Sequence, residues 1–149
     1  MKYRHQFRVR APLARVAEFH SRTAGLALLI PPPIVARIHR APIIQREGDE
    51  VDFTMWLGPL PIRWIARIDS VSETGFVDRQ VRGPFERWLH CHTFTPIDAS
   101  TTAVIDDVQA VLKAHRGWGA VGLTMWLALP LLFAYRGWKT RRALETKPT

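Results

Sequence analysis

At 149 residues the chain fits one domain, 1–149, which can bury most of its apolar surface without a disulfide staple. A single cysteine, Cys91, excludes an internal disulfide, and no signal-peptide pattern opens the sequence, so we expect a cytoplasmic protein. The formal net charge of +8 is unevenly spread: nine Lys/Arg stand against one acidic residue over 1–46, five against eleven over 47–107, and seven against one beyond.

Basic or polar residues alternate with aromatic and aliphatic ones over 2–10, beginning at Lys2 and ending at Arg10. This period of two predicts a strand with one solvent-exposed face and one buried face. A nucleic-acid binder would interleave its basic residues with aromatic or polar base readers, and no recognisable binding motif occurs. We therefore expect no nucleic-acid partner, and an anionic membrane surface is the alternative for the excess positive charge.

Two short helices are expected next, because Pro12 ends the first strand. Apolar residues at helical spacing over 12–20 predict the first helix. Ser21 followed by the apolar run 26–30 predicts a second helix, which ends at Pro31-Pro32-Pro33.

Six further strands follow, separated by segments of turn composition. They are expected over 35–39, 51–57, 62–70, 75–81, 87–94 and 102–112. The breaks include Gly58-Pro59-Leu60-Pro61, Gly83-Pro84 and Pro96-Ile97-Asp98. Short turns join antiparallel neighbours, so these strands form a meander. One strand, two helices, six strands and a final helix place the chain in the α+β class.

Residues 117–135 carry no Asp, Glu, Lys, Arg or His, which approaches the ~20 apolar residues that span a bilayer. Gly117, Gly119, Gly122 and Pro130 interrupt the run, and basic residues flank both of its ends. We expect a Gly-rich loop up to about Gly122 and then a buried helix with basic residues near its C-terminus. Peripheral contact of 117–133 with a membrane is the second interpretation, and a membrane span is the third.

This element order resembles that of the SRPBCC superfamily, the START-related and polyketide cyclase/dehydrase-like group with the helix-grip fold. The likeness is carried by Ala11-Pro12-Leu13, by Phe19-His20 before the prolines, by the stretch 76–94 with Asp106 downstream, and by 133–136. The resemblance implies a curved antiparallel sheet of about seven strands around a long C-terminal helix, with an internal hydrophobic cavity. Members of the group include lipid carriers, hormone and metabolite binders and aromatase/cyclases, so the resemblance selects no single activity.

The strand over 87–94 places Trp88, His90, His92 and Phe94 on one face and Leu89, Cys91 and Thr93 on the other. On the inner face, the first four would offer stacking surface, hydrogen-bond donors and a base that titrates near neutral pH. On the outer face, the histidines would be ordinary half-solvated residues. The expected ligand-binding residues are Trp88, His90, His92, Phe94, Trp64, Phe19, Leu132 and Tyr135.

Catalytic candidates are His90, His92 and Asp106, which could serve acid–base chemistry on an enclosed substrate. No nucleophile elbow and no phosphate-binding glycine loop occurs. Two histidines two residues apart can ligate one ion, with Asp106 or Asp107 as a third ligand, but no recognised metal-ligand spacing is present. We expect neither a metal nor a cofactor.

Three functions remain open from the sequence. The first is a binding or carrier protein for a hydrophobic or amphipathic small molecule, such as a lipid, a polyketide-like compound or an aromatic metabolite, without turnover. The second is a cyclase or dehydratase-like enzyme that uses His and Asp groups. The third is a regulatory module associated with the membrane surface. The oligomeric state is not indicated by any pattern.

Overall fold

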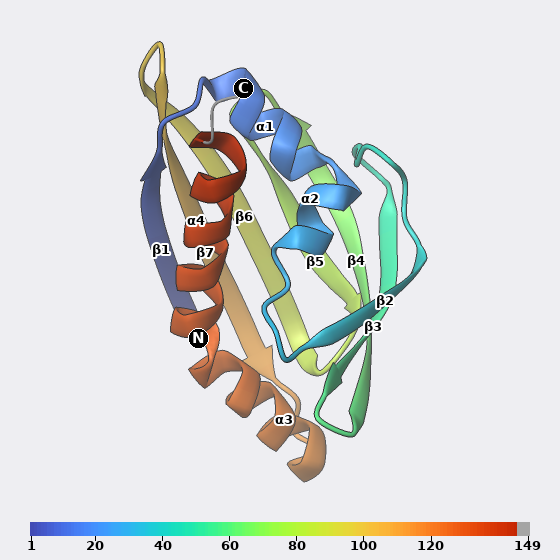
Figure 1. The fold of residues 1–149 in the computed structure, drawn as a ribbon. Coiled ribbons are helices and arrows are strands. Elements are labelled where there is room, and N and C mark those ends of the chain that lie inside the picture. Colours follow the sequence, from blue (N-terminus) through green and yellow to red (C-terminus); the bar gives the residue numbers. More distant parts are fainter. Residues whose placement is uncertain (146–149) are drawn as a thin grey trace.

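The computed structural model describes residues 1–145. Seven antiparallel strands form one curved sheet in the order β1-β7-β6-β5-β4-β3-β2, and the helices lie over its concave face (Figure 1). The strands are β1 Lys2–Val9, β2 Val35–Arg40, β3 Glu50–Leu57, β4 Leu60–Ser72, β5 Gly75–Arg82, β6 Phe85–Asp98 and β7 Thr101–Leu112. The helices are α1 Leu13–Ser21, α2 Thr23–Leu28, α3 Arg116–Leu127 and α4 Leu129–Glu145. The α+β helix-grip arrangement predicted from the sequence is thus confirmed.

The first strand of the chain forms one edge of the open sheet, beside the last strand. β2 to β7 follow one another as a meander, and β1 then pairs with β7 from Lys2↔Gln109 to Val9↔Thr102. The alternating pattern of β1 behaves as its sequence predicts: the basic side chains are exposed, while Phe7 and Val9 are buried. The sequence of β1 therefore orients it with its charged side chains on the convex face.

β6 and β7 exceed their predicted bounds at the hairpin that joins them. Pro96 was expected to end the strand, but β6 continues to Asp98, and Pro96 pairs with Thr102. Because proline has no N–H to donate, a central strand accepts it only where the ladder is irregular. The register does shift there, between Pro96 and Asp98, and the turn is formed by residues 99–100.

The C-terminal region differs from the expected loop and single long helix. Gly119 and Gly122 lie inside α3, where a Cβ on Gly122 would be 3.0 Å from Leu112 Cδ2 and one on Gly119 would be 2.7 Å from the Lys113 carbonyl oxygen. The glycines thus let α3 pack closely on the end of β7 instead of forming a loop. α3 and α4 are bent by 46° at a break that precedes Pro130, whose missing N–H removes a helix hydrogen bond.

Neither α3 nor α4 alone is long and apolar enough to cross a bilayer, and no other single helix among residues 1–145 is. The bent pair α3 and α4, taken together, has the length and apolar composition of a membrane span, and the comparison is of length and composition only.

Candidate functional site

A pocket of about 460 Å³ lies between the inner face of the sheet and the helices. Its walls come from the segment after α2, from β3 to β6, and from both C-terminal helices, and they are mainly aliphatic and aromatic. The charged, imidazole and amide side chains on the walls are His20, Gln45, Asp78, His90, His92 and Arg136. The pocket is therefore an apolar space with a small set of polar groups.

The inner face of β6 carries the residues whose orientation the sequence left open. Trp88, His90 and His92 all line the pocket, and Phe94 is buried on the same face. Cys91, between the two histidines, is only partly buried and lies on the other face of the strand, where burial and the nearby Asp107 raise the pKa of its thiol.

Of the expected ligand-binding residues, some lie on the pocket wall and others lie outside it. Trp64 and Leu132 lie on the pocket wall with the β6 residues. Phe94 and Phe19 instead pack into a separate hydrophobic cluster with α1. The Tyr135 ring contacts the Trp138 ring, with 5.7 Å between the ring centres, and is not on the pocket wall.

Two histidines and two aspartates from three neighbouring strands form a compact buried cluster, which we call the His–Asp cluster: Asp78, His90, His92 and Asp106. The register of the sheet assembles it, because His90 is the cross-strand partner of Asp78 and His92 that of Asp106. The two imidazole rings are 3.7 Å apart between centres. Side-chain exposure is 16% or less for every member.

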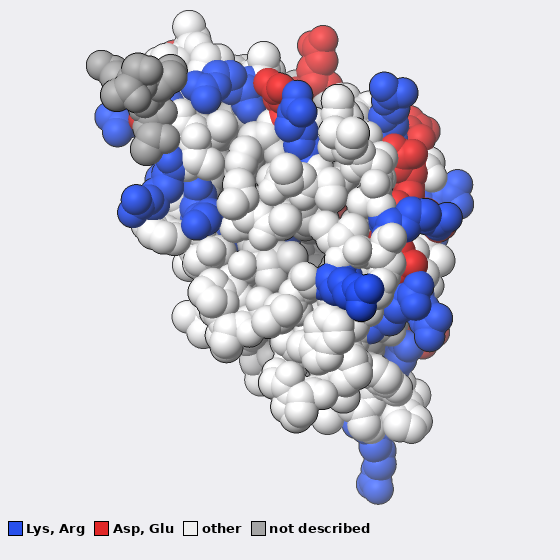
Figure 2. Space-filling model, turned by 45° about the vertical axis from the view of Figure 1, so that its right-hand side comes forward, with Lys and Arg blue, Asp and Glu red and all other residues white. Residues whose placement is uncertain are grey.

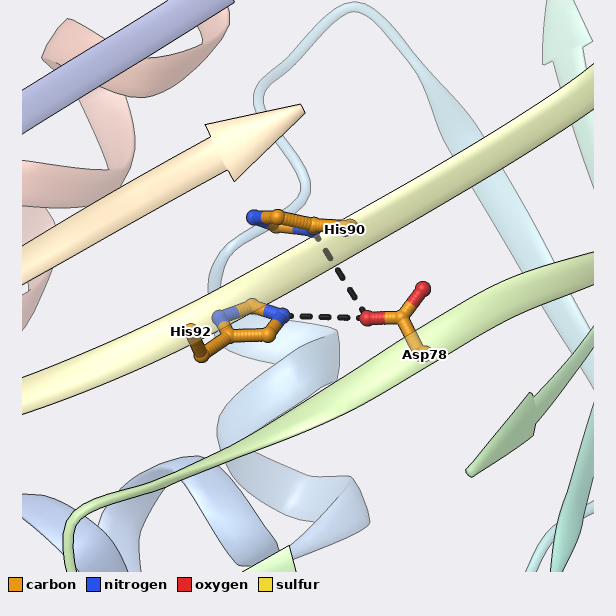
Figure 3. A group of neighbouring side chains, drawn as sticks. All are labelled: Asp78, His90 and His92. Atoms are coloured by element: carbon orange, nitrogen blue, oxygen red, sulfur yellow. Dashed lines mark hydrogen bonds and ion pairs between the residues drawn. The ribbon is translucent and has the colours of Figure 1, made fainter. Parts of the chain in front are cut away.

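The two carboxylates approach the histidines from opposite sides. Asp78 Oδ2 lies 3.0 Å from His92 Nε2 and 3.7 Å from His90 Nδ1, the two contacts drawn in Figure 3. Asp106 Oδ1 lies 2.9 Å from His90 Nε2 and 3.1 Å from His92 Nδ1. The last contact is close but lacks hydrogen-bond geometry, so His92 Nδ1 is left without a directed partner. Asp78 lines the pocket and Asp106 does not.

These contacts shift the pKa values of the two histidines in opposite directions. Burial lowers the pKa of His90, and the neighbouring His92 lowers it further. Burial also acts to lower the pKa of His92, but Asp106 and Asp78 outweigh it and raise that pKa. Burial acts to raise the pKa values of both aspartates, yet the histidines hold the pKa of Asp78 below its ordinary value and that of Asp106 well below it.

Two further residues extend the polar end of the pocket. Burial lowers the pKa of His20 to about 4, although its Nδ1 lies 2.9 Å from the carbonyl oxygen of Val16. Arg136, on α4, has a buried Nε without a hydrogen-bond partner and a guanidinium stacked 5.4 Å from the centre of the Phe133 ring. Burial lowers the pKa of Arg136 as well, against the attraction of Asp106 and Asp78.

Sequence reasoning missed Asp78, His20, Gln45 and Arg136 as residues of this site. Asp78 had a readable signal, because it shares the parity of Phe76 in the strand predicted over 75–81, but its partner depended on the register with β6. Arg136 stood in the quoted 133–136 segment without an assigned role. Its position on the inward side of α4 depends on how the helix docks on the sheet, which composition does not specify.

Comparison with known proteins places this geometry in a known fold. No protein-family model matches the chain, and no curated protein matches it in sequence. Among solved structures, protein CV1439 from Chromobacterium violaceum has a TM-score of 0.76 at 13% identity and covers 99% of both chains. The ZhuI aromatase/cyclase from Streptomyces sp. R1128 has a TM-score of 0.70 at 17% identity, over 100% of this chain and 99% of its own.

The chain has the helix-grip fold. Norcoclaurine synthase from Thalictrum flavum, in a structure with dopamine and hydroxybenzaldehyde, has a TM-score of 0.70 at 15% identity and covers 100% of this chain and 89% of its own. The helix-grip fold inferred from the sequence motifs is therefore confirmed. Identities this low compare folds, and the chemistry of this chain has to be argued from its own residues.

Proposed function

We propose that this chain binds a ring-bearing or amphipathic small molecule in the pocket, as a binding or carrier protein. The observation that carries the proposal is the pocket itself: about 460 Å³, with mainly apolar walls and a small set of polar side chains. Ligand sites typically measure ~300–1,000 Å³ and combine apolar walls with a few placed polar groups. A norcoclaurine synthase of the same fold was solved with two aromatic molecules, which is in keeping with such a ligand.

The polar end favours a ligand with an oxygen acceptor. Arg136 Nε is a buried donor with no partner, and His90 and His92 lie on the same stretch of pocket wall. A guanidinium can only donate, so a carbonyl, phenolate or carboxylate oxygen would satisfy it. The apolar body of the ligand would then lie against Trp64 and Trp88, whose rings are edge-on to each other with their centres 5.4 Å apart.

The test is a binding panel read by tryptophan fluorescence and calorimetry. We expect saturable binding of amphipathic aromatic compounds at one site per chain, and weaker binding of analogues that lack the oxygen acceptor. The control is Ala66→Phe, which places a ring in the pocket from the inner face of β4. Wild-type protein that binds nothing in a broad panel, or an Ala66→Phe variant that binds as tightly as wild type, would contradict the proposal.

A cyclase or dehydratase-like enzyme is the second candidate. The observation in its favour is geometric, because two His–Asp contacts of 2.9 Å and 3.0 Å stand in or directly behind the pocket wall. A histidine held by a carboxylate can transfer a proton to or from an enclosed, oriented substrate. Incubation with polyketide-like and aromatic carbonyl compounds should then give products in the wild type and none in His90→Gln and His92→Gln. Full turnover in both variants would remove this candidate.

Peripheral membrane contact is an additional proposal for 117–133, alongside small-molecule binding. Leu127 is 70% exposed and Leu131 78%, at the bend between α3 and α4. Figure 2 shows few charged side chains on the lower part of the face in view, the end of the molecule where α3 lies in Figure 1. Lys113 and Arg116 precede this apolar stretch, a combination suited to anionic lipid.

The test of membrane contact is sedimentation with vesicles of phosphatidylcholine and phosphatidylglycerol at low salt. We expect co-sedimentation that falls as salt is added and that Leu127→Glu abolishes. Equal sedimentation of Leu127→Glu and wild type, or none by wild type, would reject this contact.

A further inference from the structure

The pocket side of the His–Asp cluster offers three donor atoms that converge on one point. Asp78 Oδ2, His92 Nε2 and His90 Nδ1 face one another, with the carboxylate oxygen 3.0 Å and 3.7 Å from the two nitrogens. One ligand atom from each of these residues lies within 4.8 Å of the others. An ion bound at ~2.1 Å in tetrahedral geometry holds its ligand atoms about 3.4 Å apart, which lies between the two measured separations. The three residues in Figure 3 are thus spaced as ligands of one ion.

The opposite side of the cluster provides the support that metal-bound histidines require. Asp106 Oδ1 lies 2.9 Å from His90 Nε2 and 3.1 Å from His92 Nδ1, the nitrogens that do not face Asp78. His90 can therefore donate its Nε2–H to Asp106, and His92 Nδ1 lies close enough to the same oxygen for electrostatic attraction, while the other nitrogen of each ring faces the pocket. A carboxylate behind a ligating histidine fixes its tautomer and orientation in many metal sites. Here one carboxylate hydrogen-bonds His90 and contacts His92.

The charges of the site also suit a divalent cation. Two buried carboxylates, Asp78 and Asp106, flank the two imidazoles, and Arg136 supplies the neighbouring guanidinium. A divalent ion would balance both carboxylates and leave one positive charge on Arg136, available for an anionic oxygen in the pocket. Nitrogen and carboxylate donors together favour zinc and iron(II) over calcium or magnesium.

We propose that Asp78, His90 and His92 bind a divalent transition-metal ion of the zinc or iron(II) class, and that Asp106 is a positioning residue for both histidines. Three protein ligands leave at least one coordination position open, and because all three residues line the pocket, that position faces the pocket. A water molecule or a ligand oxygen would complete the coordination. The proposal is independent of small-molecule binding. It excludes proton transfer by the same histidine nitrogens while the ion is bound.

The experiment is a titration of tag-free, EDTA-treated protein with Co²⁺ and with Zn²⁺, followed by calorimetry and visible absorption. We expect one equivalent of Co²⁺ with a d–d absorption band that Zn²⁺ displaces. The near-isosteric variants His90→Gln, His92→Gln and Asp78→Asn should lose stoichiometric binding while circular dichroism shows them folded. The matched control His39→Gln, an exposed histidine on β2, should bind as wild type does.

A separate variant tests the positioning role of Asp106. Asp106→Asn should keep the stoichiometry, weaken binding by ~10–100-fold and shift the Co²⁺ absorption band, because the rings lose their carboxylate partner. Asp107→Asn, on the opposite face of the same strand, should change neither. Wild-type protein that takes up neither ion stoichiometrically, or a His90→Gln/His92→Gln double variant that binds like wild type, would overturn the metal site. An unchanged Co²⁺ spectrum in Asp106→Asn would overturn the positioning role.

Discussion

The two ends of the sheet's inner face are built from similar apolar residues, but one end is closely packed and the other borders a pocket. At one end, which we call the packed end, Phe7, Val9, Val16, Phe94 and Leu144 form a cluster that α1 and the last turn of α4 cover, and none of these residues lines the pocket. At the other, the pocket end, a second cluster forms the pocket wall through Trp64, Ala66, Trp88, Leu129 and Phe133. The His–Asp cluster is on the same inner face, with Phe94 on one side of the two histidines along β6 and Trp88 on the other.

The difference lies in what covers the sheet. α1 packs directly on β6 and β7 at the packed end. At the pocket end, the 46° bend directs α3 away from the line of α4. Large aromatic side chains therefore indicate burial at both ends, but the placement of the helices decides which of them face a pocket.

The largest effect that would sharpen this comparison is expected from Phe94→Ala. The side chain is 2% exposed at the packed end, and its removal should leave a cavity that costs ~3–5 kcal/mol of unfolding free energy. Leu132→Ala, on the pocket wall, should cost only about 1 kcal/mol, because the atoms removed already border open space. Urea unfolding measures both, and equal losses would show that the two ends are packed alike.

The second prediction compares the inner and outer faces of β7. Asp106→Ala removes the carboxylate that contacts both buried histidines and should lower the unfolding free energy by roughly 3 kcal/mol. Asp107→Ala breaks only an exposed pair with Arg4 and should cost no more than ~1 kcal/mol. Thermal and urea unfolding of the two variants decide the matter, and an Asp106→Ala variant as stable as Asp107→Ala would contradict the buried cluster.

The smallest effects come from adding volume instead of removing it. Ala11→Leu inserts three carbons at the packed end, where Ala11 is 1% exposed, and should cost about 1–3 kcal/mol through strain. Ala66→Leu adds the same three carbons toward the pocket and should change stability by less than ~1 kcal/mol, since they fill open space. A larger loss in Ala66→Leu than in Ala11→Leu would argue against open space beside β4.

Much of the fold could be predicted from the sequence because it follows from local patterns. The alternation in β1 and the turn residues between the later strands predicted seven strands and their order along the chain. The errors were at Pro96, which lies at a register shift inside β6, at Leu60-Pro61, which were expected in a turn but begin β4, and at the glycines of α3. Glycines in a sequence favour a loop, and Gly119 and Gly122 are required inside α3 because Lys113 and Leu112 lie against them. Those are tertiary contacts, which the local sequence does not indicate.

The candidate site was predictable only in part, for a similar reason. Period two placed His90 and His92 on one face, and the SRPBCC resemblance drew attention to them. Asp78 was not predicted as a site residue because it meets the histidines only through the register between β5 and β6. The sequence of neither strand alone specifies that register. Phe19 and Phe94 looked equivalent to Trp64 and Trp88 in sequence, and the position of α1 separates them.

The central claim is that the pocket end of the sheet binds a small molecule, and native mass spectrometry of freshly purified protein tests it most directly. We predict that wild-type chain carries, or takes up from an aromatic amphipathic panel, one small molecule per chain that is lost on denaturation. Ala66→Phe, prepared in the same way, should show the mass of the chain alone. A wild-type protein that stays at the bare mass throughout, or an Ala66→Phe variant that retains the same adduct, would contradict the account.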